Sequence, residues 1–286
     1  MKLIAIDLDG TLLTTESKIS PENRAAIKRA VDAGILVTIC TGRATFDVKA
    51  LLEDLDIPII AANGGTVHDT GYRLISKTLM DQQAGKDIAD YLLSQNIYFE
   101  VYTDHHLLSP FDGQSKLQAE LDILKSANPD EDIHTLWQGA MTQFKQFGIK
   151  PVHDIQTVFD GNENVYKLLC FSFDMEKLKK AKEELTHHQK LSQTSSGKHI
   201  IEILPASSGK GRALTELADR YGIEKQDIYA IGDSPNDLSM FEVAGHGIAM
   251  ENAIEELKEK STFVTKSNDE NGVAYFIDQL LDNQYE

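Results

Sequence analysis

Hydrophobic and polar residues alternate along the first third of the chain in blocks that predict strands and helices in turn. An apolar run at 3–8 predicts a buried strand, which Gly10 ends. After a short polar link, apolar residues at three-and-four spacing predict a helix that begins at Ser20-Pro21 and ends at Gly34. A strand, a helix and a strand follow at 35–40, 46–55 and 59–62. This alternation predicts an α/β fold with a doubly wound, Rossmann-like sheet, whose ligands bind at the carboxyl ends of the strands.

The same alternation returns in the last third of the chain, after a central block with a different pattern. Here we predict helices at 209–221, 235–244, 253–260 and 273–281, and strands at 227–231, 247–250 and 262–265. In the central block we predict strands at 98–103, 165–173, 191–194 and 199–204, and helices at 81–94, 117–125, 142–147, 152–159 and 175–187. Turn signals at Gly64-Gly65 and Thr70-Gly71 predict a small hairpin before this block. We therefore expect a discontinuous core of residues 1–80 and 206–286, interrupted by an inserted α+β domain at 81–205.

Composition and charge narrow the range of partners. The 286 residues include 28 basic and 45 acidic side chains, and the net charge of −17 argues against nucleic acid or an anionic membrane as the main partner. No apolar stretch approaches the ~18 residues of a membrane span. Cys40 and Cys170 lie in separate apolar runs, which favours buried reduced thiols over a disulfide. We expect a cytoplasmic protein, and the sequence leaves its oligomeric state open.

Carboxylates follow two of the predicted strands. Asp7 and Asp9 come at the end of the first strand, and Asp233 and Asp237 follow the strand at 227–231. Carboxylates gathered at one edge of a sheet repel one another unless a cation lies among them, and oxygen ligands near a phosphate favour Mg²⁺. Two plainer interpretations stay open: Asp9-Gly10 is a common turn pair, and Asp237 alone could complement a helix dipole.

A phosphorylated ligand would also need positive charge and hydrogen-bond donors. Lys210 stands at the start of a predicted helix, and Thr41 and the amide of Gly42 follow the second strand. The segment before Lys210 is not a P-loop, because Leu204 stands where that motif requires its first glycine. A lysine at a helix start is by itself more often a solvated surface charge, so Lys210 is a candidate phosphate-binding residue only in combination with the other motifs.

Four motifs together resemble one known family. DLDGT at 7–11, TGR at 41–43, GKG at 209–211 and GDSPND at 232–237 closely resemble the haloacid dehalogenase superfamily of aspartate-nucleophile phosphatases, and in particular its Cof-type branch. The motifs occur in the order of the family and span the whole predicted core. The connection at 12–20 is too short to hold a lid domain, so the resemblance implies that the insert at 81–205 is a cap of type C2.

The resemblance also implies a role for each motif residue. Asp7 is expected to be the nucleophile, and Asp9 the acid for the leaving oxygen and then the base for water. Asp233 is expected to bind Mg²⁺ with Asp7 and the backbone carbonyl of Asp9. We expect six further residues to bind the phosphoryl group or to complete the set of ligands around the phosphoryl group and the metal: Leu8, Thr41, Gly42, Lys210, Asn236 and Asp237.

The expected activity is Mg²⁺-dependent hydrolysis of a small phosphorylated metabolite through an aspartyl phosphate. The Cof-type branch acts on sugar phosphates, nucleotides, pyridoxal phosphate and flavin-pathway intermediates such as 5-amino-6-(5-phospho-D-ribitylamino)uracil. An Asp at position 9 favours a phosphatase or phosphomutase over members that keep a long-lived aspartyl phosphate. Two alternatives stay open: a phosphotransferase or phosphomutase with the same covalent chemistry, and a regulator that binds a phospholigand without turnover.

Overall fold

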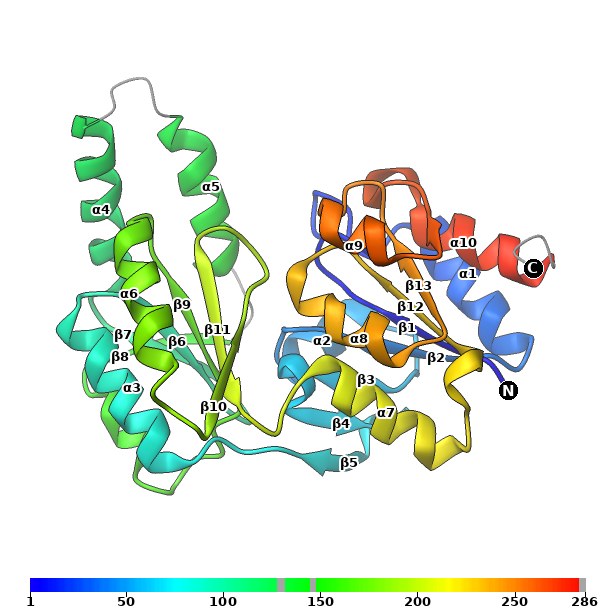
Figure 1. The fold of residues 1–286 in the computed structure, drawn as a ribbon, viewed down its shortest axis with the longest axis horizontal. Helices are drawn as coiled ribbons and strands as arrows, with labels where there is room; N and C mark the ends of the chain where they lie inside the picture. The colour runs from blue at the N-terminus through cyan, green and yellow to red at the C-terminus, as the bar shows by residue number, and fades with distance from the viewer. Residues whose placement is uncertain (128–131, 145–147, 283–286) are drawn as a thin grey trace. The chain divides into compact units, whose positions relative to one another are not determined.

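The computed structural model describes residues 1–127, 132–144 and 148–282, and it divides into two compact units. The first unit comprises Met1–Lys77 and Ser208–Glu286, and the second comprises Thr78–Ser207. The chain therefore builds the first unit from its two ends, and the second unit from the segment between them (Figure 1).

The first unit is built on an eight-stranded sheet. Its strands are Leu3–Ile6 (β1), Leu36–Cys40 (β2), Ile59–Ala61 (β3), Thr66–His68 (β4), Leu74–Lys77 (β5), Ile228–Gly232 (β12), His246–Ala249 (β13) and Phe263–Val264 (β14). They lie in the order β14-β13-β12-β1-β2-β3-β4-β5. The pairs from β14 to β3 are parallel, and β3, β4 and β5 are antiparallel, which confirms the hairpin. All four residues of β1 are buried, as expected for a central parallel strand.

Helices cover the two faces of this sheet. They are Pro21–Asp32 (α1), Thr45–Leu52 (α2), Lys210–Tyr221 (α7), Leu238–Val243 (α8), Glu255–Lys260 (α9) and Gly272–Leu281 (α10). The side chain of Ser20 caps α1 by accepting a hydrogen bond from the amide of Asn23. Helices α1 and α10 pack against each other on one face, and α7 and α8 do so on the other (Figure 1). Short 3₁₀ helices occupy Ala62–Gly64 (η1), Thr70–Tyr72 (η2), Lys225–Asp227 (η4), Pro235–Asp237 (η5) and Asn268–Glu270 (η6).

The second unit contains a six-stranded, mostly antiparallel sheet. Its strands are Tyr98–Tyr102 (β6), Leu107–Pro110 (β7), Ile149–Val152 (β8), Lys167–Phe171 (β9), Leu191–Thr194 (β10) and Ile200–Pro205 (β11), in the order β10-β11-β9-β6-β7-β8. Within the described part of this unit, β7 and β8 pair in parallel and the other neighbouring strands are antiparallel. The helices of this unit are Gln82–Ser94 (α3), Gly113–Ala127 (α4), Ile133–Phe144 (α5) and Met175–Leu185 (α6), with the 3₁₀ helix Ile155–Phe159 (η3).

The two faces of this second sheet differ in chemistry. One face packs against α3 and α6 through an apolar core that includes Phe99, Val101, Leu168, Cys170 and Ile201. The alternate residues of the same strands include four buried polar side chains, which we call the insert cluster: Tyr98, Glu100, Lys167 and Glu202.

Three sequence-based predictions in the second unit need correction or completion. The predicted helix at 152–159 is wrong, because Val152 ends β8 and only Ile155–Phe159 (η3) is helical. The helix predicted at 142–147 belongs to α5, which begins much earlier at Ile133, and residues 145–147 lie outside the described part of the chain. Strands β7 and β8 escaped prediction because each contains a proline, Pro110 or Pro151, which is typical of edge strands and strand ends.

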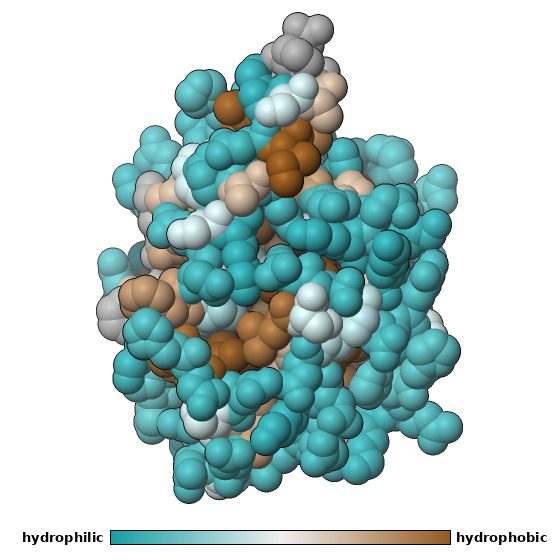
Figure 2. All heavy atoms as spheres, turned by 90° about the vertical axis from the view of Figure 1, so that its left-hand side faces the viewer, coloured by the Kyte–Doolittle hydropathy of each residue, from teal (hydrophilic) through white to brown (hydrophobic). Residues whose placement is uncertain are grey.

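The polarity of the surface and the two cysteines match what the composition predicted. Figure 2 shows a mostly hydrophilic face on which hydrophobic atoms form separate patches. Within the described ranges, the protein has no helix that combines the length and the hydrophobicity needed to cross a membrane. Cys40 and Cys170 are both buried and free, which confirms the expectation of separate thiols.

Candidate active site

The carboxyl ends of β1 and β12 bring the two acidic motifs together. The two strands pair in parallel, with Ile6 opposite Ile231, and the amide of Asp7 donates a 3.1 Å hydrogen bond to the carbonyl of Ile231. Asp7 therefore leaves the sheet beside the point where β12 ends and Asp233 begins the next turn. Residues more than two hundred positions apart meet at one edge of the sheet, as the sequence predicted.

Lys210 connects the two motifs. Its Nζ lies 2.7 Å from Oδ1 of Asp7 and 2.7 Å from Oδ1 of Asp237. The lysine begins α7, and its side chain is only 1 % exposed. A lysine this deeply buried needs carboxylate partners, so the interpretation of Lys210 as a solvated surface charge is wrong.

The turn after β12 fixes the positions of Asp233 and Asp237. Oδ2 of Asp237 accepts hydrogen bonds of 3.0 Å from the amides of both Asp233 and Ser234. Oδ1 of Asp233 accepts from the hydroxyl of Thr11, and Oδ2 accepts from that of Ser234, each at 2.9 Å. Gly10 is required opposite Asp233, because a Cβ at that position would lie 2.5 Å from Oδ2 and the glycine φ is +78°.

Burial and mutual repulsion shift the pKa values of these groups. Burial raises the pKa of Asp7 well above its ordinary value, and the charge of Asp237 adds to the rise, whereas Lys210 lowers the pKa. Burial, and then the charge of Asp237, raise the pKa of Asp233 to about 7. Burial alone would lower the pKa of Lys210, but the charges of Asp237 and Asp7 raise it, so the lysine stays protonated. One lysine therefore faces three carboxylates, and the remaining negative charge favours a bound cation.

The three carboxylates fit a metal ion. One oxygen each from Asp7, Asp233 and Asp237 lies within 4.8 Å of the others. Hard divalent cations prefer such carboxylate oxygens. Within the described residues, Oδ1 of Asn236 is buried beside this turn without a hydrogen-bond partner, which is a further sign that the neighbourhood is built for a ligand.

The side chain of Asp9 has a different hydrogen-bond partner from the side chains of Asp7, Asp233 and Asp237. Both of its oxygens accept hydrogen bonds from the guanidinium of Arg43, at 2.8 Å from Nε and 2.7 Å from Nη2. Burial would lower the pKa of Arg43, but its hydrogen bonds and charge interactions with Asp9, and then with Asp47, raise it. The sequence identified Arg43 only as part of the TGR motif and gave it no role.

The remaining predicted phosphate-binding residues lie on two loops of the same unit. Thr41 follows β2 and is 1 % exposed, and its hydroxyl accepts a 3.1 Å hydrogen bond from the amide of Arg43. Gly42 stands between them in the loop. The side chain of Leu8 is buried in the core, and its carbonyl accepts hydrogen bonds from the amides of Thr11 and Leu13. Only the backbone amide of Leu8 is thus suited to the role predicted for this residue.

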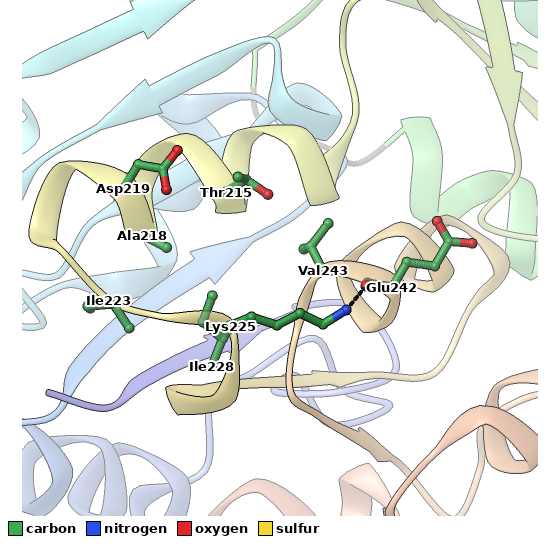
Figure 3. A pocket seen from close by; sticks show the side chains of 8 residues that line it. All are labelled: Thr215, Ala218, Asp219, Ile223, Lys225, Ile228, Glu242 and Val243. Atoms are coloured by element: carbon green, nitrogen blue, oxygen red, sulfur yellow. Dashed lines mark hydrogen bonds between the residues drawn. The ribbon is translucent and has the colours of Figure 1, made fainter.

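A pocket of about 310 Å³ opens elsewhere on the same unit (Figure 3). The side chain of Lys225 extends along it, and its Nζ donates a 2.7 Å hydrogen bond to the carbonyl of Glu242. The residues that line it are Thr215, Ala218, Asp219, Ile223, Lys225, Ile228, Glu242 and Val243. None of the aspartates of the candidate site is among them, so this pocket is separate from that site.

Comparisons with known proteins agree with this geometry. The model of the haloacid dehalogenase-like hydrolase family matches residues 4–277. A 5-amino-6-(5-phospho-D-ribitylamino)uracil phosphatase of Bacillus subtilis, YwtE, is 86% identical over 285 residues, which cover 100% of this chain and 100% of that protein. The phosphatase YwpJ of the same organism is 41% identical and covers 98% of this chain and 100% of its own length.

Solved structures give the same result. A haloacid dehalogenase-like hydrolase from B. subtilis has a TM-score of 0.86 and 40% sequence identity, and the match covers 98% of this chain and 100% of that chain. An X-ray structure from Thermotoga maritima has a TM-score of 0.73 and 29% identity, covering 97% of each chain. The predicted fold class and family are confirmed: the chain belongs to the haloacid dehalogenase-like hydrolases, and it is a phosphatase.

Proposed function

We propose that this enzyme hydrolyses 5-amino-6-(5-phospho-D-ribitylamino)uracil with the help of Mg²⁺, through an aspartyl phosphate on Asp7. The substrate comes from the relative that is 86% identical over its whole length. The observation that supports this chemistry is the position of Asp7. Its Oδ1 lies 2.7 Å from Nζ of Lys210, and one of its carboxylate oxygens is close enough to those of Asp233 and Asp237 for all three to bind one metal ion.

In the first step, a carboxylate oxygen of Asp7 attacks phosphorus while the bond between phosphorus and the ribityl oxygen breaks. Asp9 gives its proton to that leaving oxygen. In the second step, Asp9 takes a proton from water, whose oxygen bonds to phosphorus while the bond to Asp7 breaks and inorganic phosphate leaves. Lys210 offsets the negative charge that would otherwise repel Asp7 from the phosphoryl group.

Asp7, Asp233 and the backbone carbonyl of Asp9 would hold the Mg²⁺, which supplies charge neutralisation at the phosphoryl oxygens. Both oxygens of Asp237 already accept hydrogen bonds, from Lys210 and from two amides, so its main role is to orient the lysine and the metal-binding turn. The donors proposed for the phosphoryl oxygens are the amides of Leu8 and Gly42, the hydroxyl of Thr41, the amine of Lys210 and the side chain of Asn236.

The insert at 81–205 is proposed to act as the cap that selects the substrate. The insert has a sheet and an apolar core of its own, which supports a separate unit with its own role. We also propose that the enzyme works in the cytoplasm, because its two buried free thiols suit a reducing compartment. A phosphotransferase with the same covalent chemistry is the alternative, and it differs only in the acceptor of the second step.

The test is phosphate release from the proposed substrate by the purified protein with Mg²⁺, beside ribose 5-phosphate, pyridoxal phosphate and a nucleotide. Asp7→Asn should lower turnover on the order of 10⁴-fold or more, because the covalent step is lost. Asp69→Asn is the matched control, since Asp69 is equally buried but pairs with Arg73 outside the site. Substantial turnover by Asp7→Asn would contradict the nucleophile assignment, and phosphoryl transfer to an added alcohol in preference to water would favour the phosphotransferase.

A further inference from the structure

Arg43 holds the carboxylate of Asp9 with a fork of two hydrogen bonds, and a third bond ties the same guanidinium to Asp47. We propose that Asp47 and Arg43 form a positioning relay, in which Arg43 fixes the direction of the Asp9 carboxylate toward the leaving oxygen and Asp47 fixes Arg43. This inference rests on the role proposed above for Asp9 as acid and base.

The geometry of the guanidinium supports this role. Nε and Nη2 lie 2.8 and 2.7 Å from the two oxygens of Asp9, and Nη1 lies 2.7 Å from Oδ2 of Asp47. A planar fork matches a carboxylate in both distance and direction, which an ammonium group cannot do. All three nitrogens of Arg43 are thus engaged by two carboxylates, and rotation of any one of these side chains breaks at least one bond.

The far end of the relay is fixed by the fold. Asp47 lies in the first turn of α2, its side chain is 8 % exposed, and its amide donates to the carbonyl of Ala44. The backbone of Arg43 is fixed too, because its amide donates to the hydroxyl of Thr41 and its carbonyl accepts from the amide of Ala62. The backbone from which the Arg43 side chain extends is therefore held in place, and the side chain itself is only 11 % exposed.

Asp9 itself lacks such support. Its side chain is 55 % exposed, so without Arg43 it would sample several rotamers in water. A general acid must lie within hydrogen-bond reach of the oxygen that it protonates, which makes its direction important for the rate. When the leaving oxygen binds one oxygen of Asp9, Arg43 keeps the other, and Asp47 keeps Arg43 from following the carboxylate.

A purely structural interpretation predicts something different. An ion pair with one half-exposed partner contributes little to folding. If Arg43 served only to join the loop after β2 to α2, its loss would affect all substrates equally. If it positions Asp9, its loss will matter most where the leaving oxygen needs a proton.

The experiment compares kcat/KM for ribose 5-phosphate, whose leaving group is an alkoxide, and for p-nitrophenyl phosphate, whose leaving group needs no proton. Because a covalent intermediate forms, kcat/KM reports the steps up to the departure of the leaving group. The variants are Arg43→Gln, Arg43→Lys and Asp47→Asn, each also made in an Asp9→Asn background. Arg24→Gln is the matched control, since Arg24 is similarly buried and pairs with Asp54 instead.

Arg43→Gln should lower kcat/KM for ribose 5-phosphate by roughly 10- to 100-fold, and for p-nitrophenyl phosphate by less than about threefold. Asp47→Asn should give a smaller loss with the same leaving-group dependence, and Arg43→Lys should restore only part of the activity. In the Asp9→Asn background, Arg43→Gln should cause less than about a twofold further loss, because residues that act as a unit are not additive.

Equal losses for both substrates, or full additivity with Asp9→Asn, would overturn the relay and leave the proposed function intact. The proposed function has a separate point of failure, which is the Asp9→Asn variant alone. If that variant hydrolyses ribose 5-phosphate at the wild-type rate, Asp9 is not the acid, and the relay fails with it.

Discussion

Lys210 in the first unit and Lys167 in the second are both almost completely buried, and each is paired with carboxylates. Lys210 lies between Asp7 and Asp237 at the carboxyl ends of parallel strands. Lys167 lies in the middle of an antiparallel sheet, where its Nζ contacts Glu202 and stands 4.2 Å from the centroid of the Tyr102 ring. The same kind of side chain is thus used at a strand end in one unit and within a sheet face in the other.

The two clusters differ in how their negative charge is balanced. In the first unit three carboxylates face one lysine, and their oxygens are close enough for a divalent cation. In the insert cluster, Glu100 receives a 2.8 Å hydrogen bond from the hydroxyl of Tyr98, and its second oxygen is buried without a partner in the described residues. Burial raises the pKa of Glu100 to about 7, against the lowering effects of Tyr98 and Lys167.

Burial therefore raises carboxylate pKa values in both clusters, but only the first has several carboxylate oxygens close enough together to fit a divalent cation. Carboxylates at a strand end keep oxygens directed at an open edge, where a cation can join them. Carboxylates between strands are enclosed by neighbouring side chains, so neutralisation by a proton is the cheaper response to burial. The comparison leads to four predictions, which run from the largest expected effect to the smallest.

Replacing each lysine by methionine tests the comparison most directly. Both Lys210→Met and Lys167→Met should lower the free energy of unfolding by about 3–5 kcal/mol, because each leaves a carboxylate buried without its partner. Saturating Mg²⁺ should restore part of the loss in Lys210→Met and none in Lys167→Met. The measurement is urea denaturation with and without Mg²⁺ for both variants and the wild type. An equal response of the two variants to Mg²⁺ would remove the distinction between the clusters.

The pH dependence of stability tests the proton half of the comparison. The pKa of Glu100 is raised from 4.5 to about 7 on folding, so its protonated form stabilises the fold at low pH. That contribution is lost as the pH rises from the unfolded to the folded pKa, and it amounts to about 3 kcal/mol. Glu100→Gln cannot ionise, so its stability relative to the wild type should increase by this amount between about pH 4 and about pH 8.

The check is the difference in unfolding free energy between Glu100→Gln and the wild type at the two pH values, since other groups titrate in both proteins. Glu183→Gln serves as the control, because Glu183 is exposed on α6. A wild type and a Glu100→Gln variant with parallel pH profiles would show that Glu100 is ionised in the folded protein.

The sequence predicted the acidic cluster of the first unit and not the insert cluster of the second. Asp7 and Asp233 each follow an uninterrupted apolar strand, and parallel strands place such residues at one edge whatever their separation in the chain. The insert cluster depends on register: Glu100 and Glu202 lie beside Leu169 on either side only because β6 and β11 both pair with β9. No local pattern specifies that pairing. A short alternation of apolar and polar residues also does not reveal that its polar face is buried.

Arg43 escaped prediction for a related reason. Its spacing from Asp47 is that of an ordinary helical ion pair, and its distance from Asp9 in the sequence gives no sign of contact. The fold brings the two together because β1 and β2 are neighbours and Asp9 and Arg43 both follow their ends. Motif residues at neighbouring strand ends are therefore worth testing as partners even when no role is known for one of them.

The stability gained from metal binding is the third test. Mg²⁺ at about 100 times its dissociation constant should raise the free energy of unfolding by about 2.7 kcal/mol, since only the folded site binds it. Asp233→Asn should lose most of this gain, whereas Glu202→Gln should keep it. Thermal or urea unfolding over a series of Mg²⁺ concentrations measures the effect. A loss of the gain in Glu202→Gln would mean that the metal binds in the insert rather than at the end of β1.

The smallest effect concerns the two thiols, one in each unit. Cys40 and Cys170 are completely buried, and burial raises the pKa of both, so neither should react with iodoacetamide in the folded protein. Any slow labelling must then follow local opening of the unit that holds the thiol. Lys167→Met should speed the labelling of Cys170 and leave Cys40 unchanged, and Lys210→Met should do the reverse, as read by mass spectrometry of the two peptides. If either variant speeds both thiols equally, the units open together, and the two buried lysines stabilise one cooperative structure instead of two.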